Sequence, residues 1–279
     1  MKKLQYILLA AGLWMAGVTC VMADVPAANI RYVLTGGKFT NNGKSWETAK
    51  NNIQDAINSL VADKALPGEV WVGAGTYTPT ESTESSGGST LYMSFKIPAG
   101  VTVRGGFPAN GKVNGEEAGA YITRADQRRM NTTTEVGAFT IDQTILSGDL
   151  SSQTATFEYN TTRDQFTTTF YGNSYHVVTF ATNGFHADGH AKALDTSKGE
   201  AALDGVIVEH GNAHFTATGD HPHEAYGGGI YMVKGSHVYN TCVRQCEATR
   251  AGGGIYMDGG GFVDHVYVSE CQALGLGTT

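Results

Sequence analysis

The chain has 279 residues, of which 19 are lysine or arginine and 26 are aspartate or glutamate, so its formal net charge at pH 7 is −7. This acidic balance argues against nucleic acid and against anionic lipid as partners. Glycine is abundant at 37 residues, proline is scarce at 6, and short runs of valine, isoleucine and tyrosine lie between the glycines. That composition is typical of a turn-rich β protein and argues against a disordered chain.

The amino terminus has the features of a secretory signal peptide. Lys2 and Lys3 are followed by an apolar run from Tyr6 to Val18, and small residues precede a cleavage point after Ala23. The sequence therefore predicts a signal peptide over residues 1–23 and an exported mature chain. No later stretch reaches the roughly 18 apolar residues of a membrane-spanning helix, so we expect no transmembrane segment.

A helix is predicted after a short amino-terminal segment, with Ser45 as its N-cap and Pro67-Gly68 as its end. Its apolar residues at helical spacing are Trp46, Ala49, Ile53, Ala56, Ile57, Leu60 and Val61. We expect residues 24–67 to form a segment whose helix caps the open end of a β domain over residues 68–279. Residues 69–72 would then begin the first strand.

A repeat near the carboxyl end indicates the architecture of that domain. The hexapeptide Gly-Gly-Gly-Ile-Tyr-Met at residues 227–232 returns at residues 252–257, an offset of 252 − 227 = 25. A less regular copy at residues 203–213 aligns at an offset of 35, so ten extra residues between Ala213 and Gly227 must leave the domain as a loop. Units this small must stack to bury an apolar face, which predicts an all-β solenoid of parallel strands.

Stacking in this way places residue i beside residue i + 25. The expected inward ladders pair Val243 with Val268 and Cys246 with Cys271, and we expect the cysteines to be buried thiols rather than a disulfide. Tyr231 and Tyr256 would form an aromatic column, which binds sugar rings if it faces outward and is core if it faces inward. Residues 277–279 fall where another glycine triplet is due, so we expect the chain to stop in mid-repeat, as part of a longer protein.

Several segments together are similar to a known family. They are residues 45–49 (SWETA), 53–56 (IQDA), 70–77 (VWVGAGTY), 103–107 (VRGGF), 124–128 (RADQR), 144–149 (TILSGD), 173–178 (NSYHVV) and 203–205 (LDG), with the two glycine repeats. The chain resembles the secreted right-handed parallel β-helix proteins of the pectin-lyase-like superfamily, especially those related to polymorphic outer membrane proteins. One departure is that Cys246 and Cys271 stand where these relatives often have asparagine.

The resemblance implies a fold, an extracellular or outer-membrane location and a carboxy-terminal anchoring or sorting module that this chain lacks. It implies no single reaction, because such families include adhesin-like surface proteins and, more distantly, polysaccharide lyases and glycoside hydrolases. We therefore expect a surface protein that binds polysaccharide or host-cell glycans without catalysis. The alternatives are a lyase or hydrolase of acidic polysaccharide, and a structural spacer for the missing module.

Two polar clusters are candidate sites. The loop of ten extra residues and its flanks carry His214, Asp220, His221, His223 and Glu224, which could bind a divalent cation such as calcium or line a sugar groove, or could simply be a solvated loop. His186, Asp188 and His190 would point the same way if their segment were extended, and three such groups can hold a metal ion. We otherwise expect no cofactor.

The sequence offers little support for catalysis. Asp149, Arg163 and Asp164 are the residue types that a lyase uses, but they lie in turns and threonine-rich loops. A hydrolase needs two carboxylates facing each other across the sugar, and no Asp-Asp pair is present. His176 lies in a predicted strand, where a histidine usually has a structural hydrogen bond.

Overall fold

The computed structural model describes residues 25–83, 90–131, 139–151, 156–160, 165–169, 172–186, 190–214 and 222–275. The expected signal peptide lies outside these residues. Within them the chain is mostly β structure, and its three larger sheets contain only parallel pairings. The described part of the chain has no helix long and apolar enough to cross a membrane.

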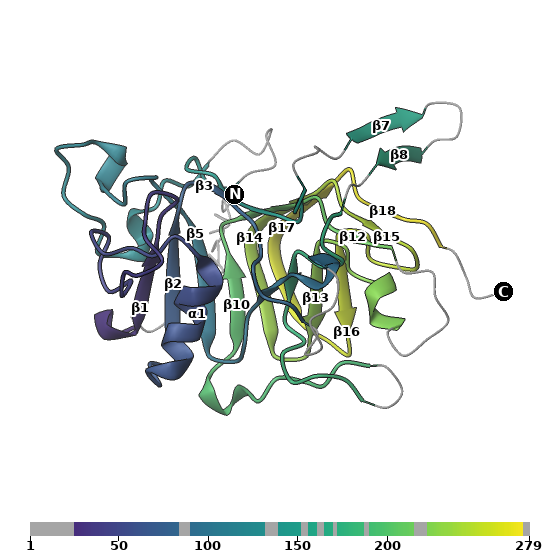
Figure 1. Ribbon diagram of the computed structural model, residues 1–279, viewed down its shortest axis with the longest axis horizontal. Helices are drawn as coiled ribbons and strands as arrows, with labels where there is room; N and C mark the ends of the chain where they lie inside the picture. The colour runs from purple at the N-terminus through teal and green to yellow at the C-terminus, as the bar shows by residue number, and fades with distance from the viewer. Residues whose placement is uncertain are drawn as a thin grey trace, which may run out of the picture.

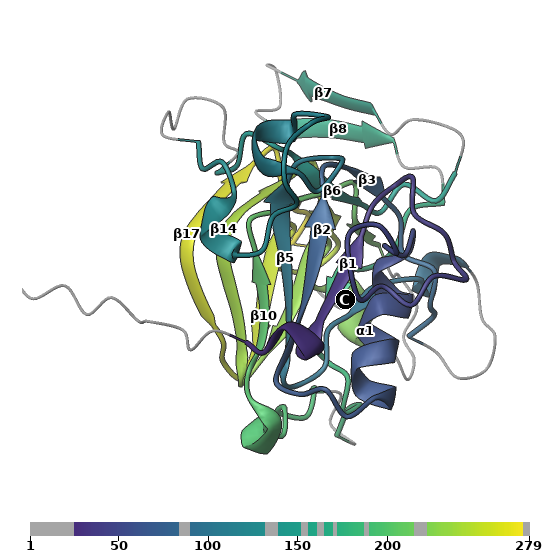
Figure 2. The same cartoon turned by 90° about the vertical axis from the view of Figure 1, so that its left-hand side faces the viewer.

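The largest sheet has nine strands and forms one long wall of the molecule (Figure 1). Its strands form two rows that share the long strand β14. The first row runs in the order β1 (Ile30–Val33), β2 (Gly68–Gly73), β5 (Val101–Phe107), β10 (Ala201–Asp204), β14 (Ser236–Arg244) and β17 (Phe262–Ser269). The second row joins β14 through β11 (Ile207–Glu209) to β6 (Thr144–Ser147) and β3 (Gly75–Tyr77). Figure 2, seen from the β1 end, shows the strands of the first row lying one behind another.

Two smaller sheets and a hairpin complete the β structure of the described residues. The first sheet contains β12 (Asn212–Ala213), β15 (Glu247–Ala248) and β18 (Gln272–Ala273). The second contains β16 (Ile255–Asp258), β13 (Ile230–Val233), β9 (Val178–Thr179) and β4 (Phe95–Lys96). Strands β7 (Thr156–Asn160) and β8 (Gln165–Thr169) form an antiparallel pair.

Short 3-10 helices lie in the connections. They are Ala27–Asn29, Thr90–Tyr92, Val113–Gly115, Ala125–Gln127, Thr196–Lys198 and Pro222–Ala225, the last of which is η7.

The chain passes through these sheets in a repeated order. It runs from β10 through β11 and β12 to β13, next from β14 through β15 to β16, and then from β17 to β18. Each strand pairs with its counterpart in the preceding pass. The chain is therefore a stack of similar passes, which agrees with the parallel β architecture predicted from the repeat.

The predicted offsets of 25 and 35 residues are confirmed by the strand registers. Val243 pairs with Val268 and Ile230 with Ile255, each at an offset of 25, while Val208 pairs with Val243 at an offset of 243 − 208 = 35. Val243 is fully buried, whereas Val268 is 49% exposed because it lies on β17, the last strand of the row.

Cys246 and Cys271 occupy neighbouring passes, as the repeat predicted. Each cysteine immediately precedes the paired residues Glu247 and Gln272 of β15 and β18. Both are free thiols, and Cys246 is buried with its Sγ donating to the carbonyl of Arg244 at 3.1 Å. Burial raises the pKa of the Cys246 thiol above that of an ordinary cysteine.

The predicted helix is shorter than its apolar pattern suggested. α1 spans Ile53–Ala62, and Asn52 is its N-cap, with Oδ1 accepting from the Asp55 N–H at 3.1 Å. The expectation of a helix starting at Ser45 is wrong, as is the expectation that residues 69–72 begin the first strand, because β1 precedes α1 and pairs with β2. α1 packs against β1, β2 and β4.

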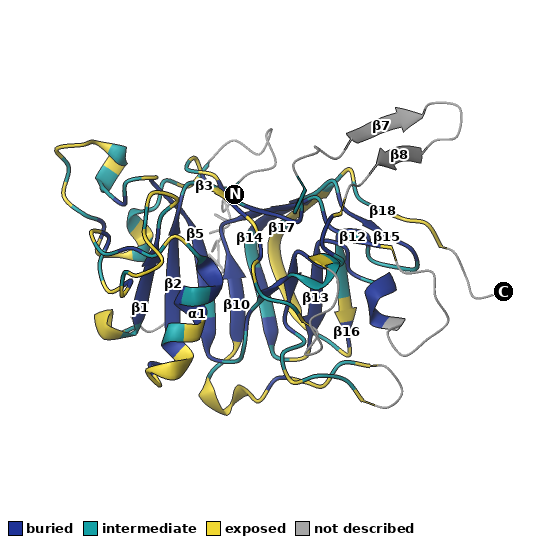
Figure 3. Cartoon of the chain, viewed as in Figure 1, coloured by how far each residue is buried: buried dark blue, intermediate teal, exposed yellow. Residues whose placement is uncertain are grey.

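Trp46 fits the helical spacing of the apolar residues but does not belong to the helix. Its indole lies against Tyr32 and Phe107, with ring centroids 4.6 and 5.5 Å away, and its Nε1 donates to the carbonyl of Ile122 at 2.9 Å. This aromatic cluster is separate from the main core, which α1 joins through Ile57 and Leu60. Figure 3 shows β1, β2, β10 and most of β5 in dark blue, whereas α1 has buried, intermediate and exposed residues along its length.

Candidate functional site

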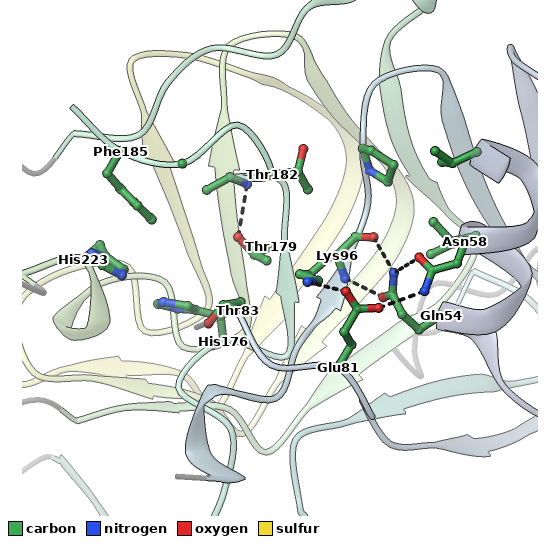
Figure 4. A pocket seen from close by; sticks show the side chains of 15 residues that line it. Gln54, Asn58, Glu81, Thr83, Lys96, His176, Thr179, Thr182, Phe185 and His223 are labelled. Atoms are coloured by element: carbon green, nitrogen blue, oxygen red, sulfur yellow. Dashed lines mark hydrogen bonds and ion pairs between the residues drawn. The ribbon is translucent and has the colours of Figure 1, made fainter. Parts of the chain in front are cut away.

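A cavity of about 430 Å³ lies beside α1 and strands β4 and β9. Its polar lining residues are Gln54, Asn58, Glu81, Thr83, Lys96, His176, Thr179, Thr182 and His223. Its other lining residues are Ile57, Val61, Pro98, Ala181, Gly184 and Phe185. Figure 4 shows the charged and amide side chains gathered at one end of this cavity and the Phe185 and His223 rings at the other.

The polar end is a connected network based on α1. Gln54 binds the backbone of Lys96 on both sides, with its Oε1 accepting from the Lys96 N–H at 2.9 Å and its Nε2 donating to the Lys96 carbonyl at 3.2 Å. Asn58, one helical turn later, donates from Nδ2 to Glu81 Oε2 at 2.9 Å. These bonds attach the helix to β4 and to the segment around residue 81.

Glu81 and Lys96 form an ion pair within this network. Lys96 Nζ contacts Glu81 Oε1 and also donates to the carbonyl of Ser82 at 3.1 Å. Partial burial raises the pKa of Glu81, but hydrogen bonds from Asn58 and Lys96 outweigh this effect and hold the pKa below its ordinary value. The carboxylate is therefore ionised at neutral pH, and its charge is balanced by Lys96.

The opposite end of the cavity is aromatic. The Phe185 ring stacks on the His223 imidazole, with centroids 3.8 Å apart and planes 18° from parallel. Phe185 also meets Tyr231 edge-on, at 6.1 Å and 75°. Tyr231 is buried beneath these rings, so Phe185, which is half-buried, forms the accessible aromatic surface.

His176 lies between the two ends. Its Nδ1 is 3.0 Å from the carbonyl oxygen of Gly227, which can only accept a hydrogen bond, so Nδ1 carries the proton and Nε2 a lone pair. Nε2 is buried and has no hydrogen-bond partner among the described residues. Burial lowers the pKa of His176 to about 4, and the imidazole is therefore neutral at neutral pH.

The residues of the cluster predicted in the loop of extra residues do not all lie together in the structure. His223 lies in η7 at the aromatic end of the cavity, and Glu224 is buried next to it. His214 ends up elsewhere, with its Nδ1 3.7 Å from Glu247 Oε1. Asp220 and His221 lie outside the described residues.

In the second predicted cluster, the residues on either side are bonded to each other: the His186 N–H donates to the His190 carbonyl at 2.8 Å, and Phe185 forms an antiparallel bridge with Ala191. His190 Nδ1 lies 2.8 Å from Asp258 Oδ1, while His186 is exposed and Asp188 lies outside the described residues. The two predicted clusters are adjacent, because the Phe185–His223 stack joins them.

The other described sequence candidates are not among the lining residues of this cavity. Asp149 accepts from the Ser151 N–H at 3.1 Å and stabilises a turn, whereas Arg163 and Asp164 lie outside the described residues. Tyr231 and Tyr256 are neighbours as the repeat predicted, with ring centroids 5.4 Å apart and planes tilted by 53°, but the burial of Tyr231 leaves no exposed aromatic column. Across the described ranges, no group of three histidine, cysteine or acidic side chains could hold a metal ion.

A second polar cluster that the sequence did not reveal is the arginine–carboxylate network of Glu69, Arg104, Arg128 and Asp204. Arg104 Nη2 lies 2.8 Å from Glu69 Oε1, Arg128 Nη2 lies 3.0 Å from Asp204 Oδ2, and Arg104 also contacts Asp204. Burial raises the pKa of Asp204, but Arg128 and Arg104 outweigh this and keep it below its ordinary value. Two positive and two negative charges compensate each other, so we assign this network to stability.

The residues that form the cavity's polar end were missed by sequence reasoning. Gln54 and Asn58 are polar residues four positions apart in a predicted helix, a spacing that places both on one face and could have identified them. Glu81 and Lys96 have no such signal. Comparison of the chain with protein-family models, with curated proteins and with solved structures gave no significant match.

Proposed function

We propose that this protein is an exported surface protein that binds glycans, without cleaving them, in the cavity between α1 and β9. The observation that carries the proposal is the pairing of an accessible aromatic ring, Phe185, with a network of hydrogen-bonding groups in one cavity. A sugar ring has an apolar face that packs well on an aromatic ring and hydroxyl groups that need donors and acceptors. The volume of about 430 Å³ falls in the ~300–1,000 Å³ range of small-ligand pockets.

We further propose that the stacked passes form a right-handed parallel β-helix related to the pectin-lyase-like superfamily. The repeated order of sheets and the parallel registers support this fold. Handedness follows from a general rule, because connections between parallel strands of one sheet are right-handed in about 98% of cases. The signal-peptide features of residues 1–23 support export to the cell surface.

The chemistry of the lining favours binding over bond cleavage. Glycoside hydrolases use two carboxylates on opposite sides of the sugar. Among the described residues that line the cavity, Glu81 is the one carboxylate, and it is held in an ion pair with Lys96. We therefore rank the lyase or hydrolase alternative second.

The test is a glycan array followed by titration calorimetry with the glycans that bind. Phe185→Ala is expected to weaken binding about 2- to 13-fold, since stacking on an aromatic ring contributes about 0.5–1.5 kcal/mol. Phe39→Ala is the matched control, because Phe39 is 68% exposed and does not line the cavity. Absence of glycan binding, or equal affinities for the two variants, would contradict the proposal. Release of reducing or unsaturated sugar ends would favour the enzyme instead.

A further inference from the structure

We propose that the cavity selects uncharged sugars by a vicinal diol that bridges Glu81 and Lys96, and rejects uronic acids. This inference rests on the proposed function and names the class of glycan. It is carried by the charge balance and the unused hydrogen-bonding capacity of the cavity's polar end.

The described lining of the cavity presents compensated charges. Glu81 and Lys96 neutralise each other through their ion pair, with side chains 38% and 26% exposed. His176, on the floor between the polar and aromatic ends, is buried in its neutral form. The remaining ionisable lining residue described is His223, whose ring is stacked on Phe185 at the aromatic end of the cavity, away from Glu81 and Lys96. An anionic ligand at the polar end thus finds no unpaired cation.

The ion pair nevertheless has capacity left for a ligand. Lys96 has three N–H donors, and its described partners are Glu81 and the Ser82 carbonyl, so one donor remains. A carboxylate accepts about four hydrogen bonds, and Glu81 accepts from Lys96 and Asn58. The pair therefore offers one donor beside free acceptor positions.

A vicinal diol matches this arrangement. One hydroxyl can donate to Glu81 while its neighbour accepts from Lys96, and the ion pair stays intact. The ring that carries the diol can then place its apolar face toward Phe185 at the other end of the cavity (Figure 4). Every group of the polar end keeps its partners in the complex.

A uronate offers the same ring diol but brings an additional carboxylate into the cavity. That carboxylate accepts but cannot donate, so it can use Lys96 only by approaching Glu81, and like charges brought together are strongly unfavourable. It would also lose its hydration without gaining an unpaired cation. The geometry therefore favours a sugar with a hydroxymethyl group over its uronic acid counterpart.

The experiment measures binding of oligouronates and of the same oligosaccharides after reduction of their carboxyl groups, at pH 8 and low salt. We expect the wild-type protein to bind the reduced forms at least about tenfold more tightly. Glu81→Gln keeps an acceptor for Asn58 but leaves Lys96 unpaired, so the preference should shift toward the uronates by about tenfold or more. Asp126→Asn is the matched control, because it removes the same charge from the exposed Arg124–Asp126 pair outside this cavity.

The outcomes separate the two proposals. Binding of uronates as tightly as their reduced forms, or an unchanged preference in Glu81→Gln with the fold verified by circular dichroism, would overturn this inference and leave glycan binding in place. Failure of every glycan to bind would overturn the proposed function and this inference with it. A shift in preference in Asp126→Asn equal to that in Glu81→Gln would also overturn it, by showing that net charge alone decides.

Discussion

The buried imidazole of His176 makes the stability of the protein depend on pH in a way that one substitution should remove. Burial lowers its pKa from 6.5 to about 4 in the folded state, whereas in the unfolded chain water solvates the ring. Between pH 6.5 and about 4, His176 is therefore protonated in the unfolded chain but stays neutral in the folded protein. The stabilisation due to neutral His176 is complete above pH 6.5 and is lost as the pH falls toward 4.

The size of this effect follows from the shift. Each pKa unit corresponds to about 1.4 kcal/mol, so the full difference between the two states is about 3 kcal/mol. At pH 5 the unfolded chain is almost fully protonated at this site and the folded protein hardly at all, which corresponds to about 2 kcal/mol of the total. Asparagine at position 176 can still donate to the Gly227 carbonyl but cannot titrate.

Urea denaturation of the wild type and of His176→Asn at pH 8 and pH 5 measures the difference. The variant should be less stable than the wild type at pH 8, and the gap should shrink by about 2 kcal/mol at pH 5. His265→Asn, at an imidazole 69% exposed, controls for the loss of a histidine. A gap that is the same at both pH values would refute the reasoning, as would an NMR titration in which folded His176 takes up its proton near pH 6.5.

Three further predictions concern stability and reactivity. Asp204→Asn leaves the two guanidinium groups of the arginine–carboxylate network with one carboxylate. Urea denaturation should show that the free energy of unfolding falls by about 3–5 kcal/mol. A decrease below about 1 kcal/mol would contradict the assignment of this network to stability. Gly228→Ala places a Cβ against the carbonyl oxygen of Glu247 and should cost about 1–3 kcal/mol or more, whereas Gly36→Ala, which meets no atom within 4 Å, should change stability by less than about 1 kcal/mol; equal effects of the two alanines on the melting temperature would refute the packing argument. Cys246 should react with iodoacetamide far more slowly in the folded protein than in urea, because its thiol is buried and its pKa is raised, and mass spectrometry showing equal rates would refute this.

Much of the stacking could be predicted from the sequence, because a parallel stack relates residues at a constant separation along the chain. The hexapeptide repeat placed Val243 beside Val268, and the less regular copy placed Val208 beside Val243 despite the intervening loop. Repeating units carry their register in the sequence, since the same side chains must meet in every pass. The glycine triplets follow the same rule, because a side chain at Gly228 would overlap the next pass.

The helix shows where local pattern stops being sufficient. Trp46 and Ala49 have helical spacing relative to Ile53, but the Trp46 indole is drawn into the cluster with Tyr32, Trp71 and Phe107, and the helix begins only after Asn52. Burying a large aromatic side chain against three others outweighs the weak preference of a few residues for helix. That choice depends on residues 46 − 32 = 14, 71 − 46 = 25 and 107 − 46 = 61 positions away, which no local helix window contains.

The cavity was decided by the tertiary structure alone. Its polar end joins α1 to residues 81 and 96, and its aromatic end joins residue 185 to residue 223, across connections that have no repeat and no fixed length. The sequence determined the repeating wall, because every pass must match its neighbour. The site lies where non-repeating connections leave that wall and pack against each other. Which connections meet depends on packing between segments far apart in the sequence, not on any periodicity of the chain.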